Sequence, residues 1–154
     1  ELPEPTQAQL EAGNHKMAHP TVQGMKVSIE NPKGSERKGV DKDGKPWSVK
    51  MNDHYGYFKG TIGYDKDHLD VFMGPTAEQT GTVYIVDQIT PSTGKFDEHK
   101  VMMGFNTKES AVKGYLSAYE KGWNQYEKNV IEMDIETFKN WLDKKSQKKE
   151  IENE

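Results

Sequence analysis

Three aspartates near the middle of the chain, Asp65, Asp67 and Asp70, are the side chains best suited to chemistry. In an extended segment alternate side chains share a face, so Asp65 and Asp67 point the same way, and Asp70 joins them only if the chain turns or bulges near His68. Carboxylates held this close repel one another unless a cation lies between them. Oxygen ligands of this kind suit hard dications such as Mg²⁺, Mn²⁺ or Ca²⁺. The spacing therefore predicts a divalent-cation site.

A second acidic cluster, Asp97-Glu98-His99-Lys100, lies within a β-like segment. On a regular strand Glu98 and Lys100 share one face, and Asp97 and His99 share the other. One of these faces must look toward the three aspartates if both clusters belong to one site. The sequence leaves open whether Asp97 or Glu98 is the metal ligand.

Basic side chains precede the aspartates along the chain. Arg37 is the only arginine, and its planar guanidinium suits bidentate phosphate contacts better than any single lysine does. Lys59 and Lys66 add positive charge near the aspartates, as a phosphate site requires. The acidic and basic groups together favour chemistry on a phosphate substrate.

Other kinds of site are excluded by their spacing. An EF-hand calcium loop that began at Asp65 would need Gly where Asp70 stands and Glu where Thr76 stands. The chain has no cysteine and no His-Glu-x-x-His, Gly-x-Ser-x-Gly, Walker or dinucleotide-binding motif. Thiolate metal sites, disulfides and a Cys nucleophile are therefore ruled out, and serine nucleophile chemistry has no support.

The composition describes one polar domain. The 154 residues are 32% hydrophobic and 30% charged, with a net charge of −4 and no basic stripe, which argues against nucleic acid as a partner. No apolar run reaches the roughly 18–20 residues that span a bilayer, so we expect no membrane partner and a cytoplasmic location. We expect a lead-in with a short helix over 1–24, the functional domain over 25–143 and a frayed, charged tail over 144–154.

Strands are predicted before helices. Alternating or β-rich segments predict strands at 25–30, 47–51, 55–61, 68–73, 82–89 and 96–103, with a hairpin turn at Asp43-Gly44. Thr107 is expected to begin a helix that runs to about 121, and Asp134 to begin a second helix. This order favours an α+β fold with an antiparallel, barrel-like sheet.

The block from Asp65 to Val71, preceded by Tyr55-Gly56-Tyr57 and Thr61, resembles the signature of the soluble, magnesium-dependent family I inorganic pyrophosphatases. The similarity covers roughly residues 25–123. More closely, the chain resembles the pyrophosphatase-like domains of phage and mobile-element polyvalent proteins. Those domains share Gln9 to Asn14, Glu30 to Ser35, Phe72 to Pro75, Val86 to Gln88 and Phe96 to Lys100, which extends the resemblance over nearly the whole chain.

The resemblance implies a small, distorted five-stranded antiparallel β-barrel of OB-like, pyrophosphatase type with flanking helices. It implies Mg²⁺, with Mn²⁺ as an alternative, and pyrophosphate as the small-molecule substrate of a cytoplasmic hydrolase in a bacterial host. Asp67 would accept the proton of the attacking water. The remaining roles would fall to metal ligands Asp65, Asp70, Asp97 and Glu98, to phosphate-binding Arg37, Lys50, Lys100 and Tyr119, and to supporting Glu30 and Tyr55.

Two family carboxylates have no counterpart in this chain. One position falls near Gly39 and the other near Ser92-Thr93, so the chain offers fewer metal ligands than the family pattern does. This departure motivates an alternative: a non-catalytic module of a phage or mobile-element polyprotein that binds metal, phosphate or a partner. Hydrolysis of a nucleotide or another diphosphate also stays open, as does the oligomeric state.

Overall fold

The computed structural model describes residues 19–40, 43–61, 68–90, 93–119 and 127–143. Its elements are β1 (Thr21–Val22), β2 (Met25–Asn31), β3 (Glu36–Val40), β4 (Pro46–Lys50), β5 (His54–Phe58), β6 (Leu69–Met73), β7 (Thr82–Ile89), β8 (Phe96–Met103), α2 (Lys108–Ser117), β9 (Glu127–Asp134) and α3 (Ile135–Leu142). None of the described helices is long and apolar enough to cross a membrane.

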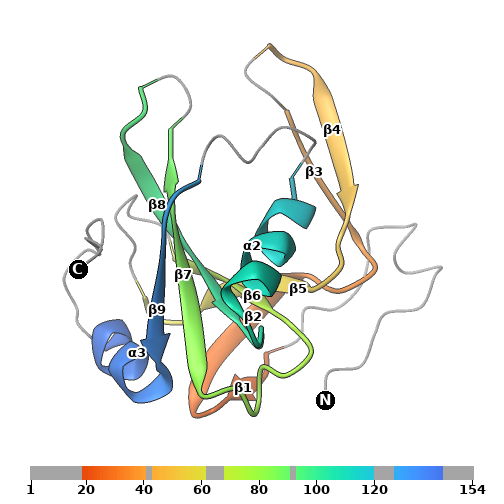
Figure 1. Ribbon diagram of the computed structural model, residues 1–154. Helices are drawn as coiled ribbons and strands as arrows, with labels where there is room; N and C mark the ends of the chain where they lie inside the picture. Colours follow the sequence, from red (N-terminus) through yellow and green to blue (C-terminus); the bar gives the residue numbers. More distant parts are fainter. Residues whose placement is uncertain (1–18, 41–42, 62–67, 91–92, 120–126, 144–154) are drawn as a thin grey trace.

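Seven strands form one curled sheet in the order β1-β2-β5-β6-β8-β7-β9. All neighbours are antiparallel except β6 and β8, which run parallel. Strands β3 and β4 pair only with each other, and Figure 1 shows this hairpin projecting from the sheet as an arm. The parallel contact matters for function because it brings the start of β6 beside the middle of β8.

Each face of the sheet carries its own apolar core. Val27, Phe58, Val71 and Ile85 belong to one core, which Phe138 of α3 completes. The other core lies under α2 and is largely aromatic, with members that include Tyr55, Phe72, Tyr84 and Tyr115. Helix α2 packs on β7, β8 and β9. It therefore covers the face of the sheet that carries the second core.

Most predicted elements are confirmed. β7 and β8 have the expected bounds, the hairpin turn falls between β3 and β4, and Thr107 caps α2 with its side chain accepting from the Ser110 N–H. Asp134 caps α3 in the same way through Thr137. Residues 1–18, which include most of the lead-in with its expected short helix, and the tail over 144–154 lie outside the described residues.

The predicted five-stranded antiparallel barrel is wrong in strand number and in one pairing. The sheet gains β1 and β9, which the sequence did not indicate, and β8 inserts between β6 and β7 so that one pair becomes parallel. The described part of the chain is mostly β, a curled half-barrel with two helices, and it is compatible with an OB-like barrel. Helix α2 also ends at Ser117, earlier than expected, because the Ala118 N–H bonds to the Tyr115 carbonyl in a tighter turn.

Gly56 lets β2 and β5 approach each other closely. A Cβ atom placed on Gly56 would lie 1.8 Å from the Ser28 carbonyl oxygen, which belongs to the backbone and cannot swing away. Gly56 therefore fixes how near Tyr55 and Tyr57 stand to the neighbouring strand.

We expect Gly56→Ala to lower the free energy of unfolding by about 2–3 kcal/mol, because overpacking forces two strands apart. Urea denaturation measures this change. Gly81→Ala is the matched control, since a Cβ atom at Gly81 would meet nothing within 4 Å. Equal denaturation midpoints for Gly56→Ala and wild type would contradict the close approach.

Candidate functional site

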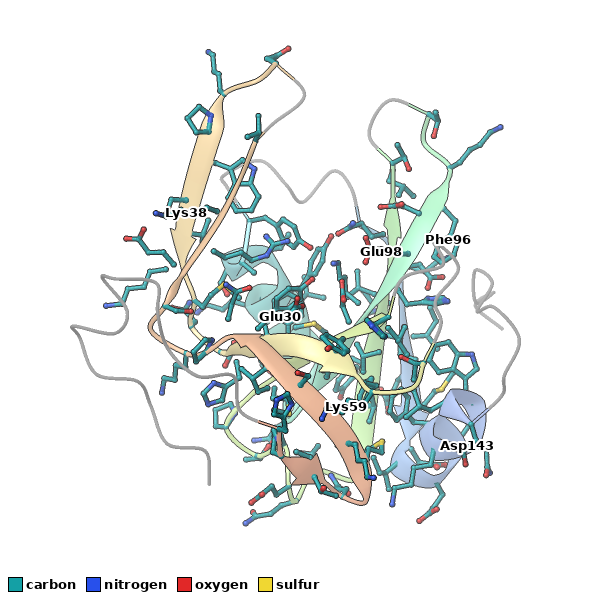
Figure 2. The ribbon with its side chains drawn as sticks, turned by 180° about the vertical axis from the view of Figure 1, so that it is seen from behind. Glu30, Lys38, Lys59, Phe96, Glu98 and Asp143 are labelled. Atoms are coloured by element: carbon teal, nitrogen blue, oxygen red, sulfur yellow. The ribbon has the colours of Figure 1, made fainter. Side chains whose placement is uncertain are left out.

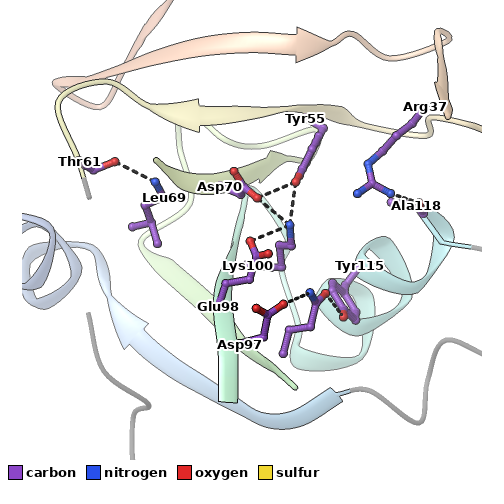
Figure 3. A network of polar contacts seen from close by, with 11 residues as sticks. Arg37, Tyr55, Thr61, Leu69, Asp70, Asp97, Glu98, Lys100, Tyr115 and Ala118 are labelled. Atoms are coloured by element: carbon purple, nitrogen blue, oxygen red, sulfur yellow. Dashed lines mark hydrogen bonds and ion pairs between the residues drawn. The ribbon is translucent and has the colours of Figure 1, made fainter. Parts of the chain in front are cut away.

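Lys100, itself buried, forms the centre of a partly buried polar cluster on the α2 side of the sheet (Figure 3). Its Nζ lies 2.6 Å from Asp70 Oδ2, 3.0 Å from Glu98 Oε1 and 2.8 Å from the Tyr55 hydroxyl. The Tyr55 hydroxyl in turn donates to Asp70 Oδ2 at 2.7 Å. An ammonium group has three donors, and these three contacts use them all.

Strand pairing explains how the cluster forms. Asp70 of β6 stands directly opposite Lys100 of β8 in the parallel ladder. Tyr55 follows from β5, on the other side of β6, and Glu98 lies two residues before Lys100 on the same face. Asp70 of the first acidic cluster thus meets Glu98 of the second in one place.

The positive charge of Lys100 and the protonation of the two carboxyl groups depend on each other. Burial alone would raise the pKa of Asp70, but the Lys100 ammonium and the hydrogen bonds it receives lower that pKa below its usual value. Burial raises the pKa of Glu98 to about 7, against the Lys100 charge, and the neighbouring Asp70 carboxyl adds to the rise. Asp70 is therefore the ionised member of the pair near neutral pH, and Glu98 shares a proton with it.

Lys100 remains charged despite its burial. Burial works to lower the pKa of its ammonium group, but the surrounding tyrosine and carboxyl oxygens raise the pKa well above its ordinary value. Burial also raises the pKa of Tyr55, which keeps its phenol protonated and able to donate. For Lys100 to bind a phosphate oxygen, it must exchange one of its three present acceptors.

A β-bulge settles the relation of Asp97 to Glu98. Gln88 pairs with Glu98 and Ile89 with Phe96, so Asp97 is the extra residue on β8. In a bulge two successive residues oppose one partner, which re-aims a side chain that regular alternation would send away. The Asp97 carboxylate accepts from Gln88 Nε2 at 3.3 Å, and the Tyr115 hydroxyl of α2 donates to Gln88 Oε1 at 2.7 Å.

The expectation that Asp97 and His99 share a face is wrong for this reason. His99 points to the other side of the sheet, where its Nδ1 lies 2.8 Å from Asp87 Oδ1 and both side chains are fully buried. Asp97 instead contacts Gln88, whose side chain also receives the Tyr115 hydroxyl. Asp97 and Glu98 thus both have partners on the α2 side, and Figure 3 shows the two together there.

A second bulge places Glu30. Ile29 pairs with Gly56 and Asn31 with Tyr55, so Glu30 is the extra residue at the end of β2. Its side chain is exposed, next to the strand that carries Tyr55. The structure therefore places Glu30 on the strand next to Tyr55, and Tyr55 within the cluster.

Arg37 reaches the cluster from the β3–β4 arm. Its Nη1 donates to the Ala118 carbonyl at the end of α2 at 3.0 Å. Its guanidinium carbon lies 5.1 Å from the ring centroid of Tyr55 and 4.7 Å from that of Tyr119. Two predicted phosphate-binding residues, Arg37 and Tyr119, therefore lie together beside Tyr55.

Among the predicted site residues that the structure describes, Lys50 is one that it does not place in the cluster. It is exposed and stands opposite Glu36, on the face of the arm where the Ser48 hydroxyl donates to Glu36 Oε2. Arg37 directly follows Glu36 on β3, so its side chain lies on the other face of the arm.

Asp65 and Asp67 lie outside the described residues. The described chain resumes at His68, and on the other side it reaches Thr61, three residues after the end of β5. The Thr61 hydroxyl donates to the Phe58 carbonyl at 2.6 Å and accepts from the Leu69 N–H at 3.0 Å. Thr61 thus ties the end of β5 to the strand that carries Asp70, as Figure 3 shows.

The carboxyl groups of the cluster supply part of what a divalent cation needs. Within the described ranges no three His, Cys, Asp or Glu residues form a metal-binding group. Asp70 and Glu98 are nevertheless adjacent carboxyl groups, compensated here by an ammonium and a shared proton. Oxygen donors that need this much compensation fit a hard dication such as Mg²⁺, provided that further ligands come from elsewhere in the chain.

Sequence reasoning missed Gln88 and Trp47. The sequence places Gln88 in a predicted strand and in a block shared with the polyvalent-protein domains, but a buried amide between two polar partners gives no signal of its role. Trp47 lies 5.0 Å from the Arg37 guanidinium, across the hairpin. The Asp-Gly turn that predicted this hairpin was the one signal that could have paired the two.

The pKa of Glu98 predicts a pH-dependent stability. The folded protein holds the Glu98 proton more tightly than the unfolded chain does, so this group lowers stability as the pH rises from about 4.5 to about 7. Glu98→Gln binds no proton and should gain stability relative to wild type over that interval, by at most about 1.4 kcal/mol per pH unit.

Urea denaturation at several pH values, without divalent cations, measures that difference. Glu36→Gln removes an exposed carboxylate on the arm and is the control for the loss of one carboxyl group. A difference between Glu98→Gln and wild type that does not change with pH would contradict the raised pKa of Glu98.

One of the comparisons with known proteins found a match. No curated protein and no solved structure matches the chain. The family model described as "Inorganic Pyrophosphatase" matches residues 7–143, which is most of the 154-residue chain and includes every residue of the cluster. On this evidence the chain belongs to the inorganic pyrophosphatase family.

Proposed function

We propose that the protein hydrolyses inorganic pyrophosphate to two phosphates in a Mg²⁺-dependent reaction. The observation that carries the proposal is the convergence of Asp70, Glu98 and Lys100 from two strands that are distant in sequence. Family membership supports pyrophosphate chemistry, and the carboxyl pair supports a dication.

In this proposal the acidic residues hold the metal. Asp65, Asp70, Asp97 and Glu98 are the ligands, and the tie from Thr61 to Leu69 keeps the Asp65 segment joined to the strand of Asp70. When bound, divalent ions neutralise the charge of pyrophosphate and favour ionisation of an attacking water.

The remaining residues bind substrate and move a proton. Asp67 accepts the proton of the attacking water. Lys100 binds a phosphate oxygen by exchanging one of its protein acceptors, and Arg37 offers guanidinium donors beyond the one that Ala118 uses. Tyr119 lies against Arg37 and completes the phosphate-binding side, whereas Lys50, on the opposite face of the arm, is given no role.

One observation favours a second candidate, a non-catalytic module that binds metal and phosphate. At the position near which a family carboxylate is expected, Gly39 has no side chain, and the Trp47 indole occupies the space a Cβ would need. A chain with fewer ligands can retain the cluster for binding alone. The resemblance to phage and mobile-element polyvalent proteins supports such a modular role, in the cytoplasm of a bacterial host.

Substituting the proposed base should abolish turnover selectively. We expect Asp67→Asn to lower kcat for pyrophosphate by about 10²–10⁴-fold, because it removes a general base while keeping the shape of the side chain. Phosphate release in the presence of Mg²⁺ measures this effect. Asp143→Asn is the matched control: Asp143 is exposed at the end of α3, and Figure 2 shows it well apart from Glu98.

Equal phosphate release from wild type and Asp67→Asn would remove the catalytic role of Asp67. No release from either protein, combined with tight binding of imidodiphosphate in Mg²⁺ by titration calorimetry, would instead select the binding module. Faster release from a nucleoside diphosphate than from pyrophosphate would change the substrate and keep the site.

A further inference from the structure

The β3–β4 arm has few attachments to the rest of the described fold. It forms a separate two-stranded sheet, and its base is held by backbone hydrogen bonds that link Met51 with Gly34 and Ser35. An isolated two-stranded hairpin is marginally stable in water. Because Arg37 is carried on this arm, something must fix the arm if Arg37 is to stay beside Tyr55.

Trp47 is seated on Gly39. The two residues face each other across the hairpin, and a Cβ on Gly39 would lie 2.5 Å from Trp47 Cζ2. Only glycine leaves room for the indole at this distance. An aromatic ring that covers a cross-strand glycine compensates for the weak strand propensity of that glycine.

In this position the indole lies against Arg37. Arg37 is two residues before Gly39 on β3, so the two positions lie on the same face of the strand. The guanidinium carbon lies 5.0 Å from the Trp47 ring centroid, 5.1 Å from that of Tyr55 and 4.7 Å from that of Tyr119. Three rings therefore surround one cation, each within the range of a cation–π contact.

The same guanidinium closes the end of α2. Its hydrogen bond to the Ala118 carbonyl satisfies an acceptor that the helix leaves without an internal partner, and a positive charge is favourable at this end of a helix. Arg37 thus contacts the arm through Trp47, the sheet through Tyr55 and the helix through Ala118. Tyr55 is also a partner of Lys100 and Asp70, so these contacts end in the polar cluster.

We propose that Trp47 is a positioning residue: seated on Gly39, it holds the Arg37 guanidinium at the pyrophosphate site and thereby fastens the β3–β4 arm to the sheet and α2. Its kinetic consequence rests on the proposed function, whereas its mechanical consequence does not. Arg37 has an orientation suited to substrate only while the indole supports it, and the arm is held down only while Arg37 is in place.

The test compares variants on the arm by two readouts. Cleavage of the native protein by a lysine-specific protease, at lysines of the arm such as the exposed Lys38, reports how often the arm opens. Trp47→Leu and Arg37→Gln should each speed this cleavage about tenfold, since the first removes a ring and the second removes the cation of the stack. Trp47→Phe keeps a ring and should retain most of the protection.

Two further variants separate positioning from folding. Gly39→Ala should displace the indole and speed cleavage in the wild type, yet add nothing in the Trp47→Leu background, as a double-mutant cycle would show. Val40→Thr is the matched control, because Val40 lies on the same strand but is exposed on the other face. It should leave cleavage and activity unchanged.

Kinetics provide the second readout. In Mg²⁺ and pyrophosphate, Trp47→Leu should raise KM about tenfold with little change in kcat, because it weakens a contact made equally in the bound substrate and the transition state. Trp47→Leu with wild-type cleavage and wild-type KM would overturn the proposal.

If wild type does not hydrolyse pyrophosphate, the proposed function fails, and the cleavage cycle alone decides the role of Trp47. An additive effect of Gly39→Ala and Trp47→Leu on cleavage would refute it.

Discussion

The ammonium group of Lys100 balances two carboxyl groups from separate parts of the chain, and the candidate site depends on this interaction. Asp70 and Glu98 could not lie side by side in a buried location if their charges were left uncompensated. Lys100 donates to both and to Tyr55, and Glu98 lowers the remaining charge by holding a proton near neutral pH. One cation and one proton keep these oxygen ligands close together. A dication bound between the carboxyl groups would supply the same compensation of charge.

The backbone contributes as much as the side chains. The parallel contact of β6 with β8 places Asp70 opposite Lys100, and no antiparallel meander of the same strands would do so. The bulge at Asp97 turns a second carboxylate toward the α2 side, and a second bulge at the end of β2 makes Glu30 the extra residue there. Irregular pairings beside a site are a common way to re-aim side chains. Gly56 sets the spacing of the strands that carry these residues.

Local signals in the sequence were sufficient for most elements. The alternating segments at 82–89 and 96–103 and the caps at Thr107 and Asp134 are confirmed at those positions. β9 was missed because it begins with Glu127, Lys128 and Asn129, which favour strands poorly. Strand neighbours are a property of the whole fold, so the β6–β8 pairing had no local signal. Regular alternation likewise misplaced Asp97, because a one-residue bulge leaves no mark that composition or periodicity can detect.

The central claim is that carboxyl groups of β6 and β8 share one divalent cation. A crystal structure of the protein with Mn²⁺, located by its anomalous scattering, tests this claim most directly. The account predicts a Mn²⁺ ion within coordination distance of both Asp70 and Glu98, with Lys100 moved away from at least one of them. Mn²⁺ bound only elsewhere, with the contacts from Lys100 to Asp70 and Glu98 unchanged at a saturating concentration, would contradict it.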